Sequence, residues 1–259
     1  MDDSAERRSG RWRPVGVVAG IAIMVIVLLA GVNLSRVSAI TSRAPAAETG
    51  IIVEPSPAPP VVTDESGLNH GTTSPVSPQW SQRVAQATGI PQRALLAYAG
   101  ADVALRRQDP SCRIRWNTLA AIGSVESGHG GHGGAALDAT GRAVPQIRGP
   151  RLDGSRTARV LDSDGGRLDG DSQWDRAVGP MQFLPSTWRQ WGHDGSGDGL
   201  ADPDQIDDAA LSAAHYLCAA GGALNTASGW TRAIWAYNHS EDYVAQVRRI
   251  ADQYAAAAS

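Results

Sequence analysis

The chain has 259 residues, which is enough for one sizeable domain or two small ones. Its formal net charge is −3 at pH 7, and the sequence holds no large cluster of basic residues. This charge balance gives no reason to expect a nucleic-acid partner, because proteins that bind DNA or RNA present basic patches.

An uninterrupted apolar run covers residues 15–32 and, with the next two residues, reaches the roughly 20 residues that a bilayer-spanning helix needs. We predict a cytoplasmic tail at 1–13 and a single transmembrane helix at 14–34. Four arginines precede the run and two follow it closely, so the rest of the chain should lie outside the cytoplasm. The alternative is a cleaved signal peptide and secretion, although the apolar core of a signal peptide usually has only about 7–15 residues.

Residues 35–78 are rich in Pro, Ser, Thr and Ala, as in "VEPSPAPPVV". They hold too few large apolar residues to bury a core. We therefore predict a linker at 35–78 and one folded domain at 79–259.

Helical patterns follow one another along this domain. Pro91 is well placed at the start of one helix, and a second helix should cover 116–126. Residues 128–178 contain many Gly and Asp and little helical periodicity, so we expect a long excursion with room for a short β-hairpin. Helical patterns resume in the segments 185–191, 207–220, 230–238 and 240–256. The domain is predicted to be mainly α.

The chain has two cysteines, Cys112 and Cys218. An even pair of cysteines in an oxidising compartment is most simply a disulfide. Two buried free thiols are the alternative interpretation.

A single acid, Glu126, ends the helical pattern within "SVESGHG" at 124–130. On a helix, Leu119, Ile122 and Glu126 occupy positions i, i+3 and i+7, so the carboxyl points along the apolar stripe. Apolar surroundings raise the pKa of a carboxyl, and the negative end of the helix dipole acts in the same direction. A carboxyl that keeps its proton near neutral pH can act as a general acid. A helix-terminal Glu that turns to water is the alternative.

Two further stretches carry polar side chains suited to a sugar polymer. The stretch "AVGPMQFLPSTW" predicts a tight turn that carries Gln182 into an apolar environment, where its amide can donate to and accept from an N-acetyl group. The stretch "AYNHSEDYVAQV" places Tyr237 and Asn238 at a helix end and Tyr243 on the next helix. Each signal alone is weak, since a buried amide often ties down a loop and a tyrosine often belongs to the core.

Four stretches, "VESGHG", "GPMQFLPSTW", "HDGSGDGLADPDQIDDA" and "AYNHSEDYV", resemble lytic transglycosylases of the membrane-bound lytic murein transglycosylase B type. The resemblance covers roughly residues 80–256 and implies a lysozyme-like SLT domain. It implies that Glu126 is the sole catalytic acid and base. The expected substrate-binding residues are Gln182, Tyr237, Asn238, Ser127 and Tyr243.

The family that this chain resembles cleaves the β-1,4 bond from N-acetylmuramic acid to N-acetylglucosamine in peptidoglycan and leaves a 1,6-anhydromuramoyl end. One carboxyl suffices for that product, because Glu126 can protonate the leaving oxygen and then deprotonate the C6 hydroxyl of the same sugar. A conventional glycoside hydrolase uses two carboxylates. The excursion offers five candidates for a second acid, namely Asp162, Asp164, Asp169, Asp171 and Asp175.

The stretch "DGSGDGLAD" at 194–202 starts like a calcium-binding loop. A standard loop has Glu at its twelfth position, where Gln205 stands, but the related transglycosylases have a longer loop that closes about three residues later. The expected ligands of one structural Ca²⁺ are oxygen atoms of Asp194, Ser196, Asp198, Leu200 and Asp208. A surface turn satisfied by water is the alternative. Similar letters at 162–171 lack this spacing and predict turns, and the histidines show no zinc pattern.

The sequence as a whole predicts an anchored, extracytoplasmic peptidoglycan lytic transglycosylase that binds glycan strands and the membrane. A hydrolysing muramidase on the same fold and a non-catalytic, calcium-stabilised wall-binding module are the alternatives, since a fold does not fix a function. The position of Glu126 on an apolar stripe argues against the last of these. The sequence names no protein partner.

Overall fold

The computed structural model describes residues 56–61 and 76–259. The predicted tail at 1–13, the predicted transmembrane helix at 14–34 and most of the predicted linker lie outside the described residues. Among the helices that the structure describes, none is both long and apolar enough to cross a membrane.

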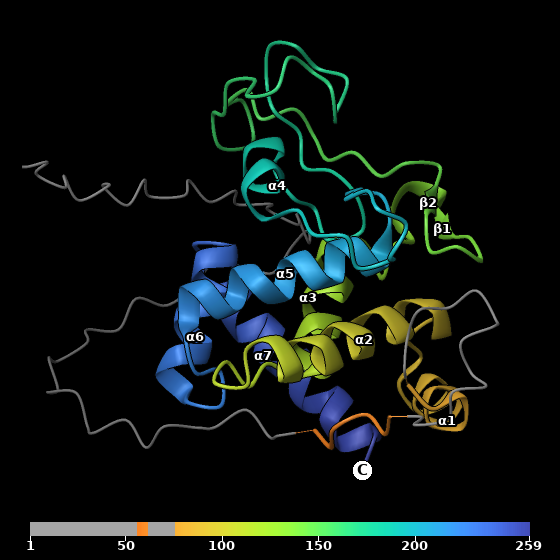
Figure 1. The fold of residues 1–259 in the computed structure, drawn as a ribbon. Coiled ribbons are helices and arrows are strands. Elements are labelled where there is room, and N and C mark those ends of the chain that lie inside the picture. The colour runs from red at the N-terminus through yellow and green to blue at the C-terminus, as the bar shows by residue number, and fades with distance from the viewer. Residues whose placement is uncertain (1–55, 62–75) are drawn as a thin grey trace, which may run out of the picture.

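The described residues form seven α-helices and one two-stranded sheet, which confirms the prediction of a mainly α protein. Their bounds, with the labels of Figure 1, are α1 (Pro78–Thr88), α2 (Gln92–Gln108), α3 (Trp116–Ser127), α4 (Pro185–Trp191), α5 (Ile206–Gly221), α6 (Ala227–Tyr237) and α7 (Glu241–Ala257).

Local side chains determine where several helices begin. Ser77, Thr226 and Ser240 cap α1, α6 and α7, and each hydroxyl accepts a backbone N–H of the first turn. The residue before α3 provides no such cap. Instead Asp102, a fully buried carboxylate on α2, accepts the backbone N–H of Trp116 at 2.9 Å. Because this negative charge faces the positive end of the helix dipole, α2 fixes the start of α3.

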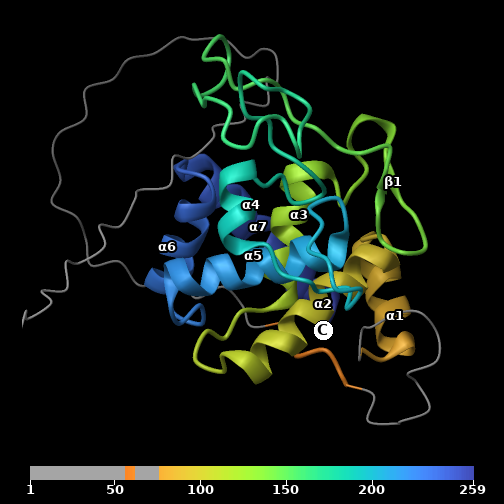
Figure 2. The same ribbon diagram turned by 45° about the horizontal axis from the view of Figure 1, so that its top comes forward.

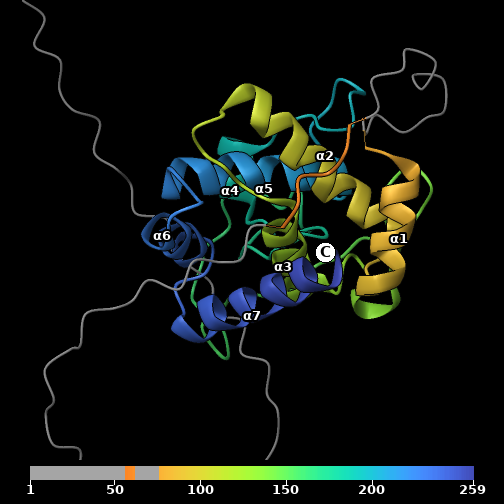
Figure 3. The same ribbon diagram turned by 90° about the horizontal axis from the view of Figure 1, so that it is seen from below.

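Helix α3 lies between α2 and α7, as Figure 3 shows. It also contacts α5, which packs on α2 and α6. Leu119 and Ile122, on the predicted apolar stripe, are fully buried in the core. The helix that carries Glu126 is therefore held by neighbours from several directions.

The excursion between α3 and α4 gathers on one side of the helices (Figures 1 and 2). It opens with a turn of 3-10 helix at His132–Gly134. A short antiparallel hairpin then pairs β1 (Ala136–Leu137) with β2 (Ala143–Val144). Isolated bridges, such as that between Leu161 and Trp174, join other parts of the excursion. The excursion therefore contains the short β-hairpin that its turn-rich sequence allowed.

Cys112 and Cys218 form a disulfide, as the sequence predicted. Their Cα atoms lie 5.3 Å apart, although the two residues are separated by 106 positions in the sequence. The bond joins the loop between α2 and α3 to the last turn of α5. It therefore holds the connection between α2 and α3 against α5.

Residues 56–61 cross the surface of the domain, and we call this segment the proline strap (Figure 3). Trp116 donates its indole N–H to the Pro57 carbonyl at 3.3 Å. The Pro60 carbonyl accepts the backbone N–H of Ser77 at 3.0 Å. This part of the predicted linker therefore contacts the folded domain at the start of α3.

Candidate active site

Glu126 stands in the last turn of α3, and its carboxyl meets α7. Tyr243, in the first turn of α7, donates its hydroxyl to Glu126 Oε1 at 2.5 Å. Helix α3 ends directly afterwards, because Gly128 adopts the left-handed conformation with φ of 58°. The glycines after the acid thus end the helix and leave Glu126 close to its C-terminus.

The Glu126 carboxyl is half-buried, and this burial raises its pKa from 4.5 to about 7. The hydrogen bond from Tyr243 lowers the pKa, because it stabilises the ionised form, but it does not outweigh burial. A carboxyl with a pKa near neutral pH is suited both to give and to take a proton.

A tight turn between Val178 and Phe183 forms a second part of the site. These two residues exchange backbone hydrogen bonds of 2.8 and 3.0 Å. Gln182 takes a left-handed φ of 50°, and its Nε2 donates to the Gly179 carbonyl at 2.9 Å. The Nε2 atom of the Gln182 amide therefore stabilises the turn in which Gln182 itself lies.

Ser127 clamps this turn to the end of α3. Its hydroxyl donates to the Pro180 carbonyl at 2.6 Å and accepts the backbone N–H of Gly130 at 2.8 Å. The residue is only 3% exposed, so its hydroxyl is occupied by these two contacts. Ser127 therefore holds the turn that carries Gln182 beside the helix that carries Glu126.

Tyr237 and Asn238 bring the end of α6 to the same place. The Tyr237 hydroxyl donates to the Met181 carbonyl at 2.7 Å. Burial raises the pKa of Tyr237, and the nearby Glu126 raises it further. Asn238 is 7% exposed, and its Oδ1 has no hydrogen-bond partner among the described residues. The ends of α3 and α6, the start of α7 and the Gln182 turn therefore meet around one carboxyl.

The aspartates that were candidates for a second acid stabilise turns within the excursion. Asp162 accepts backbone N–H groups of the residues that follow it. Asp175 accepts the backbone N–H and the hydroxyl of Ser163 at 2.9 and 2.8 Å, and Asp171 pairs with Arg151 at 2.7 Å. Short polar side chains in turns commonly bond the nearby backbone in this way. Within the described residues, no hydrogen bond joins one of these carboxylates to Glu126.

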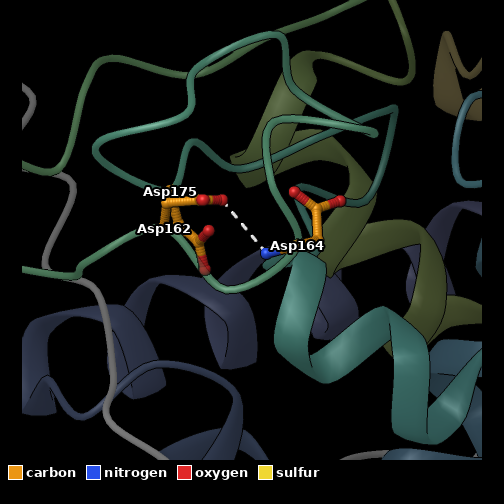
Figure 4. Close-up of side chains that lie close together, drawn as sticks. All are labelled: Asp162, Asp164 and Asp175. Carbon is orange, nitrogen blue, oxygen red and sulfur yellow. Dashed lines mark hydrogen bonds between the residues drawn. The ribbon is translucent and has the colours of Figure 1, made fainter.

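Asp162, Asp164 and Asp175 form a close acidic cluster (Figure 4). One carboxylate oxygen of each lies within 4.8 Å of the others, a spacing that could hold a metal ion. Asp175 is fully buried, and burial raises its pKa. The turns predicted at 162–171 are present, but the third acid of the cluster comes from outside that stretch.

The predicted calcium loop folds around two carboxylates. Asp208, fully buried in the first turn of α5, accepts the backbone N–H groups of Gly195 and Ser196 at 2.8 and 2.7 Å. Asp194 accepts the backbone N–H of Gly199 at 2.8 Å. Burial raises the pKa of Asp208, and the nearby charge of Asp194 adds to this rise. The two carboxylates thus approach each other across the loop.

The remaining residues of the loop are placed differently. Asp198 is exposed, and its Oδ1 accepts the backbone N–H of Leu200 at 2.9 Å. Gln205, at the position where a standard loop has Glu, caps α5 by accepting the Asp208 N–H at 3.2 Å. In the described part of the chain, Asp194, Asp198 and Asp208 do not gather as closely as the aspartates of Figure 4.

Residues 162–231 match the family model of the transglycosylase SLT domain. This segment of the chain therefore resembles a transglycosylase SLT domain. The SLT domain predicted from the sequence motifs is thereby confirmed. The matched segment begins after Glu126 and ends before Tyr237, so the placement of these two side chains rests on the geometry described above.

The chain is also similar to solved structures of lytic transglycosylases. Slt35 from Escherichia coli in complex with bulgecin A has 15% sequence identity, with 70% of this chain and 76% of that chain covered and a TM-score of 0.42. Slt35 in complex with calcium gives the same identity and coverage and a TM-score of 0.41. SltB3 from Pseudomonas aeruginosa in complex with NAG-anhNAM-pentapeptide has 20% identity, with 69% and 67% covered and a TM-score of 0.38. No curated protein matches the chain.

Sequence reasoning missed the groups that hold the site together. The carbonyls of Pro180 and Met181 accept hydrogen bonds from Ser127 and Tyr237, respectively. Every residue has a backbone carbonyl, so the sequence does not indicate which carbonyls will accept such bonds. Asp102 did leave a signal, because it stands as one acid within the apolar pattern "AYAGADVAL" of α2. A buried acid in such a pattern needs a partner, which here is the start of α3.

Proposed function

We propose that this protein cleaves peptidoglycan glycan strands as a lytic transglycosylase, with Glu126 as the catalytic acid and base. The observation that carries the proposal is the half-buried Glu126 carboxyl, with a pKa of about 7, where four segments of the chain meet. The match of residues 162–231 to the transglycosylase SLT domain supports the proposal from a separate part of the chain.

The proposed reaction needs one proton carrier and no external water. Protonated Glu126 gives its proton to the glycosidic oxygen while the bond from that oxygen to C1 of N-acetylmuramic acid breaks. The ionised carboxylate then takes the proton of the C6 hydroxyl of the same sugar while O6 bonds to C1. This step closes the 1,6-anhydro ring and restores protonated Glu126. A pKa of about 7 suits both directions of transfer at neutral pH.

Tyr243 supports this proton transfer. Its hydroxyl donates to Oε1 of Glu126, which leaves Oε2 for the proton that moves. Its hydrogen bond also stabilises the carboxylate formed after the first step, because hydrogen bonds to ionised groups are stronger than those to neutral ones. We assign Tyr243 to the carboxyl rather than to the sugar.

Asn238 and Gln182 are the proposed binding groups for the sugar. The buried Oδ1 of Asn238 has no partner among the described residues, so a donor on the substrate would remove an energetic cost. An N-acetyl N–H or a sugar hydroxyl supplies such a donor. Tyr237 holds the turn that presents Gln182, through its bond to the Met181 carbonyl.

Mass spectrometry of the fragments released from purified peptidoglycan tests the proposal. We expect 1,6-anhydromuramoyl ends from the wild-type protein and about 10²–10⁴-fold fewer fragments from Glu126→Gln. Reducing ends would identify a hydrolysing muramidase instead. Binding to the wall without any released fragment would identify a wall-binding module.

We also propose one structural calcium ion in the loop of residues 194–208. The ligands would be oxygen atoms of Asp194, Ser196, Asp198, Leu200 and Asp208, which are of the hard kind that calcium prefers. The buried Asp208 carboxylate near Asp194 supports this proposal, because burial and, to a smaller extent, the charge of Asp194 raise the pKa of Asp208, and a cation between them would offset both effects. The ion would stabilise the loop and take no part in the proton transfer.

We further propose that the helix predicted at 14–34 anchors the protein in the cell membrane, as in the membrane-bound B type, with the domain outside the cytoplasm. The disulfide between Cys112 and Cys218 supports an oxidising location for the domain. Cleavage of the apolar segment and secretion is the alternative, and it is compatible with the same disulfide.

A further inference from the structure

His129 lies between two tyrosines that belong to different helices. Its Nδ1 is 3.3 Å from the Tyr98 hydroxyl, and its Nε2 is 2.9 Å from the Tyr254 hydroxyl. Tyr98 is on α2 and Tyr254 is on α7, whereas His129 follows the end of α3. The imidazole is 8% exposed. One buried ring therefore connects three helices just beyond Glu126.

The connection suits a neutral imidazole. Burial lowers the pKa of His129 to about 4, so the ring carries no charge near neutral pH. The groups that face it, Tyr98 and Tyr254, are neutral as well, because burial raises the pKa of both phenols. A neutral imidazole has one N–H donor and one acceptor nitrogen. One tyrosine hydroxyl therefore donates to the ring and the other accepts from it.

The backbone around His129 is shaped for this arrangement. His129 has a positive φ of 61°, directly after Gly128 with φ of 58°. A non-glycine residue takes this conformation at an energetic cost that its contacts must offset. Gly123 lets Tyr98 approach α3, because a Cβ at this position would lie 2.0 Å from the tyrosine hydroxyl oxygen. The positive φ of His129 and the lack of a side chain at Gly123 thus both allow the imidazole to contact Tyr98.

Helix α7 holds both His129 and Glu126. Tyr254 contacts His129, and Tyr243 of the same helix contacts Glu126. The two tyrosines are about 16 Å apart along the axis of α7, given the rise of an α-helix. Two contacts at that separation oppose rotation of the end of α3 relative to α7.

We infer that His129 is a positioning residue for Glu126: its bridge between Tyr98 and Tyr254 fixes the end of α3 and so holds the Glu126 carboxyl against Tyr243. The catalytic part of this inference rests on the proposed function. Its geometric part concerns only the position of the carboxyl and can be measured without activity.

Three substitutions and one control test the inference. His129→Asn is the main variant, because asparagine tolerates a positive φ but is too short to reach both tyrosines. Tyr254→Phe removes one end of the bridge, together with the hydrogen bond between the side chains of Tyr254 and Ser124, and changes no residue of α3. His129→Gln keeps one donor and one acceptor on a longer side chain, so it is the conservative rescue. Val84→Ala, at a buried position of α1, is a control for general loss of stability.

On a defined glycan fragment, we expect His129→Asn and Tyr254→Phe to lower kcat about 10- to 100-fold and to change KM less than about threefold, because misplacing a catalytic group by about 1 Å slows the chemical step. His129→Gln should recover part of the loss. Val84→Ala, compared at an equal margin below its melting temperature, should keep the wild-type kcat.

The titration of Glu126, followed by carbon-13 NMR of labelled glutamate, provides a readout that a general loss of stability would not move. We expect its midpoint to rise in His129→Asn and Tyr254→Phe, because the Tyr243 hydrogen bond that lowers the pKa of Glu126 loosens. It should stay unchanged in Val84→Ala.

Wild-type kcat together with an unmoved Glu126 titration in the two bridge variants would overturn the inference. A wild-type protein that releases no anhydro ends would overturn the proposed function instead, and the titration would then still decide whether His129 positions the carboxyl. If His129→Asn does not fold, Tyr254→Phe decides the test alone.

Discussion

At the scale of single residues, the proposed cleavage depends on the transferable proton of Glu126. Glu126→Gln keeps the shape of the side chain but removes the transferable proton. We expect the rate at which glycan fragments are formed to fall about 10²–10⁴-fold, which is the usual contribution of general acid and base catalysis. Folding and glycan binding should persist. Fragment release and co-sedimentation with purified wall measure the two effects. Glu241→Gln, on the exposed start of α7, is the matched control. Activity of Glu126→Gln within a few-fold of wild type would remove Glu126 from the mechanism.

The same residue also lowers stability at high pH. Because burial raises the pKa of Glu126 from 4.5 to about 7, the folded state holds this proton more tightly than the unfolded state. Wild-type stability should therefore fall as the pH rises through this window, by at most about 3 kcal/mol at 1.36 kcal/mol per pKa unit. Glutamine carries no charge and escapes this cost.

We therefore expect Glu126→Gln to melt at a higher temperature than wild type at about pH 8 and at a similar temperature at about pH 4. Calorimetry at the two pH values measures the difference. A variant that gains equally at both values would show that the gain does not come from the charge of Glu126.

At the scale of elements, the disulfide joins the loop after α2 to α5. Replacing both Cys112 and Cys218 by serine should lower the free energy of unfolding by up to about 4.7 kcal/mol, the chain-entropy figure for a closed loop near 100 residues. Denaturant unfolding measures this loss. A reducing agent should destabilise the wild type and leave the double variant unchanged. Equal sensitivity of both proteins to the reducing agent would contradict a role for this bond.

The loop before α5 gives another test at this scale. If it binds one calcium ion in the folded state alone, stability should rise by about 2.7 kcal/mol when free calcium is 100 times the dissociation constant. The melting temperature should then rise with calcium, and Asp198→Ala should flatten that dependence. Asp153→Ala, in an exposed turn of the excursion, should not. A metal-free wild-type protein whose melting ignores both chelator and calcium would exclude the site.

Over the whole molecule, the sequence predicted six of the seven helices in the described part of the chain, all except α1, because their signals are local. Apolar spacing and a capping serine such as Ser240 lie within a few residues of the helix start that they determine. The contacts of the candidate site are not local. Ser127 bonds the Pro180 carbonyl across more than 50 positions, so Ser127 could be predicted as a residue of the site but its partner could not.

The excursion shows why letters alone could not assign every acid. Asp162 and Asp194 begin similar stretches, and each accepts backbone N–H groups of the residues that follow it. What differs is the distant acid that approaches each, Asp175 in one case and Asp208 in the other. His129 was missed for a related reason, since its two partners come from α2 and α7.

The proposed anchor predicts how the intact protein behaves in cells. The full chain should sediment with membranes, and protease added from outside should reach its domain. Mass measurement of the mature protein gives a direct check, because an anchored chain keeps the predicted apolar segment. A mature protein that begins after residues 38–47 would show that this segment is a cleaved signal.

The proline strap determines how a pulling force enters the molecule. Tension on the chain before residue 56 reaches the domain first at the strap, where Pro57 and Pro60 contact Trp116 and Ser77. The contacts of this six-residue segment give way before the core between the helices does, because that core buries far more apolar area. In an anchored enzyme, the strap would therefore peel off and lengthen the connection before the load disturbs α3. It would act as an extensible connection between the proposed membrane anchor and the domain that carries Glu126.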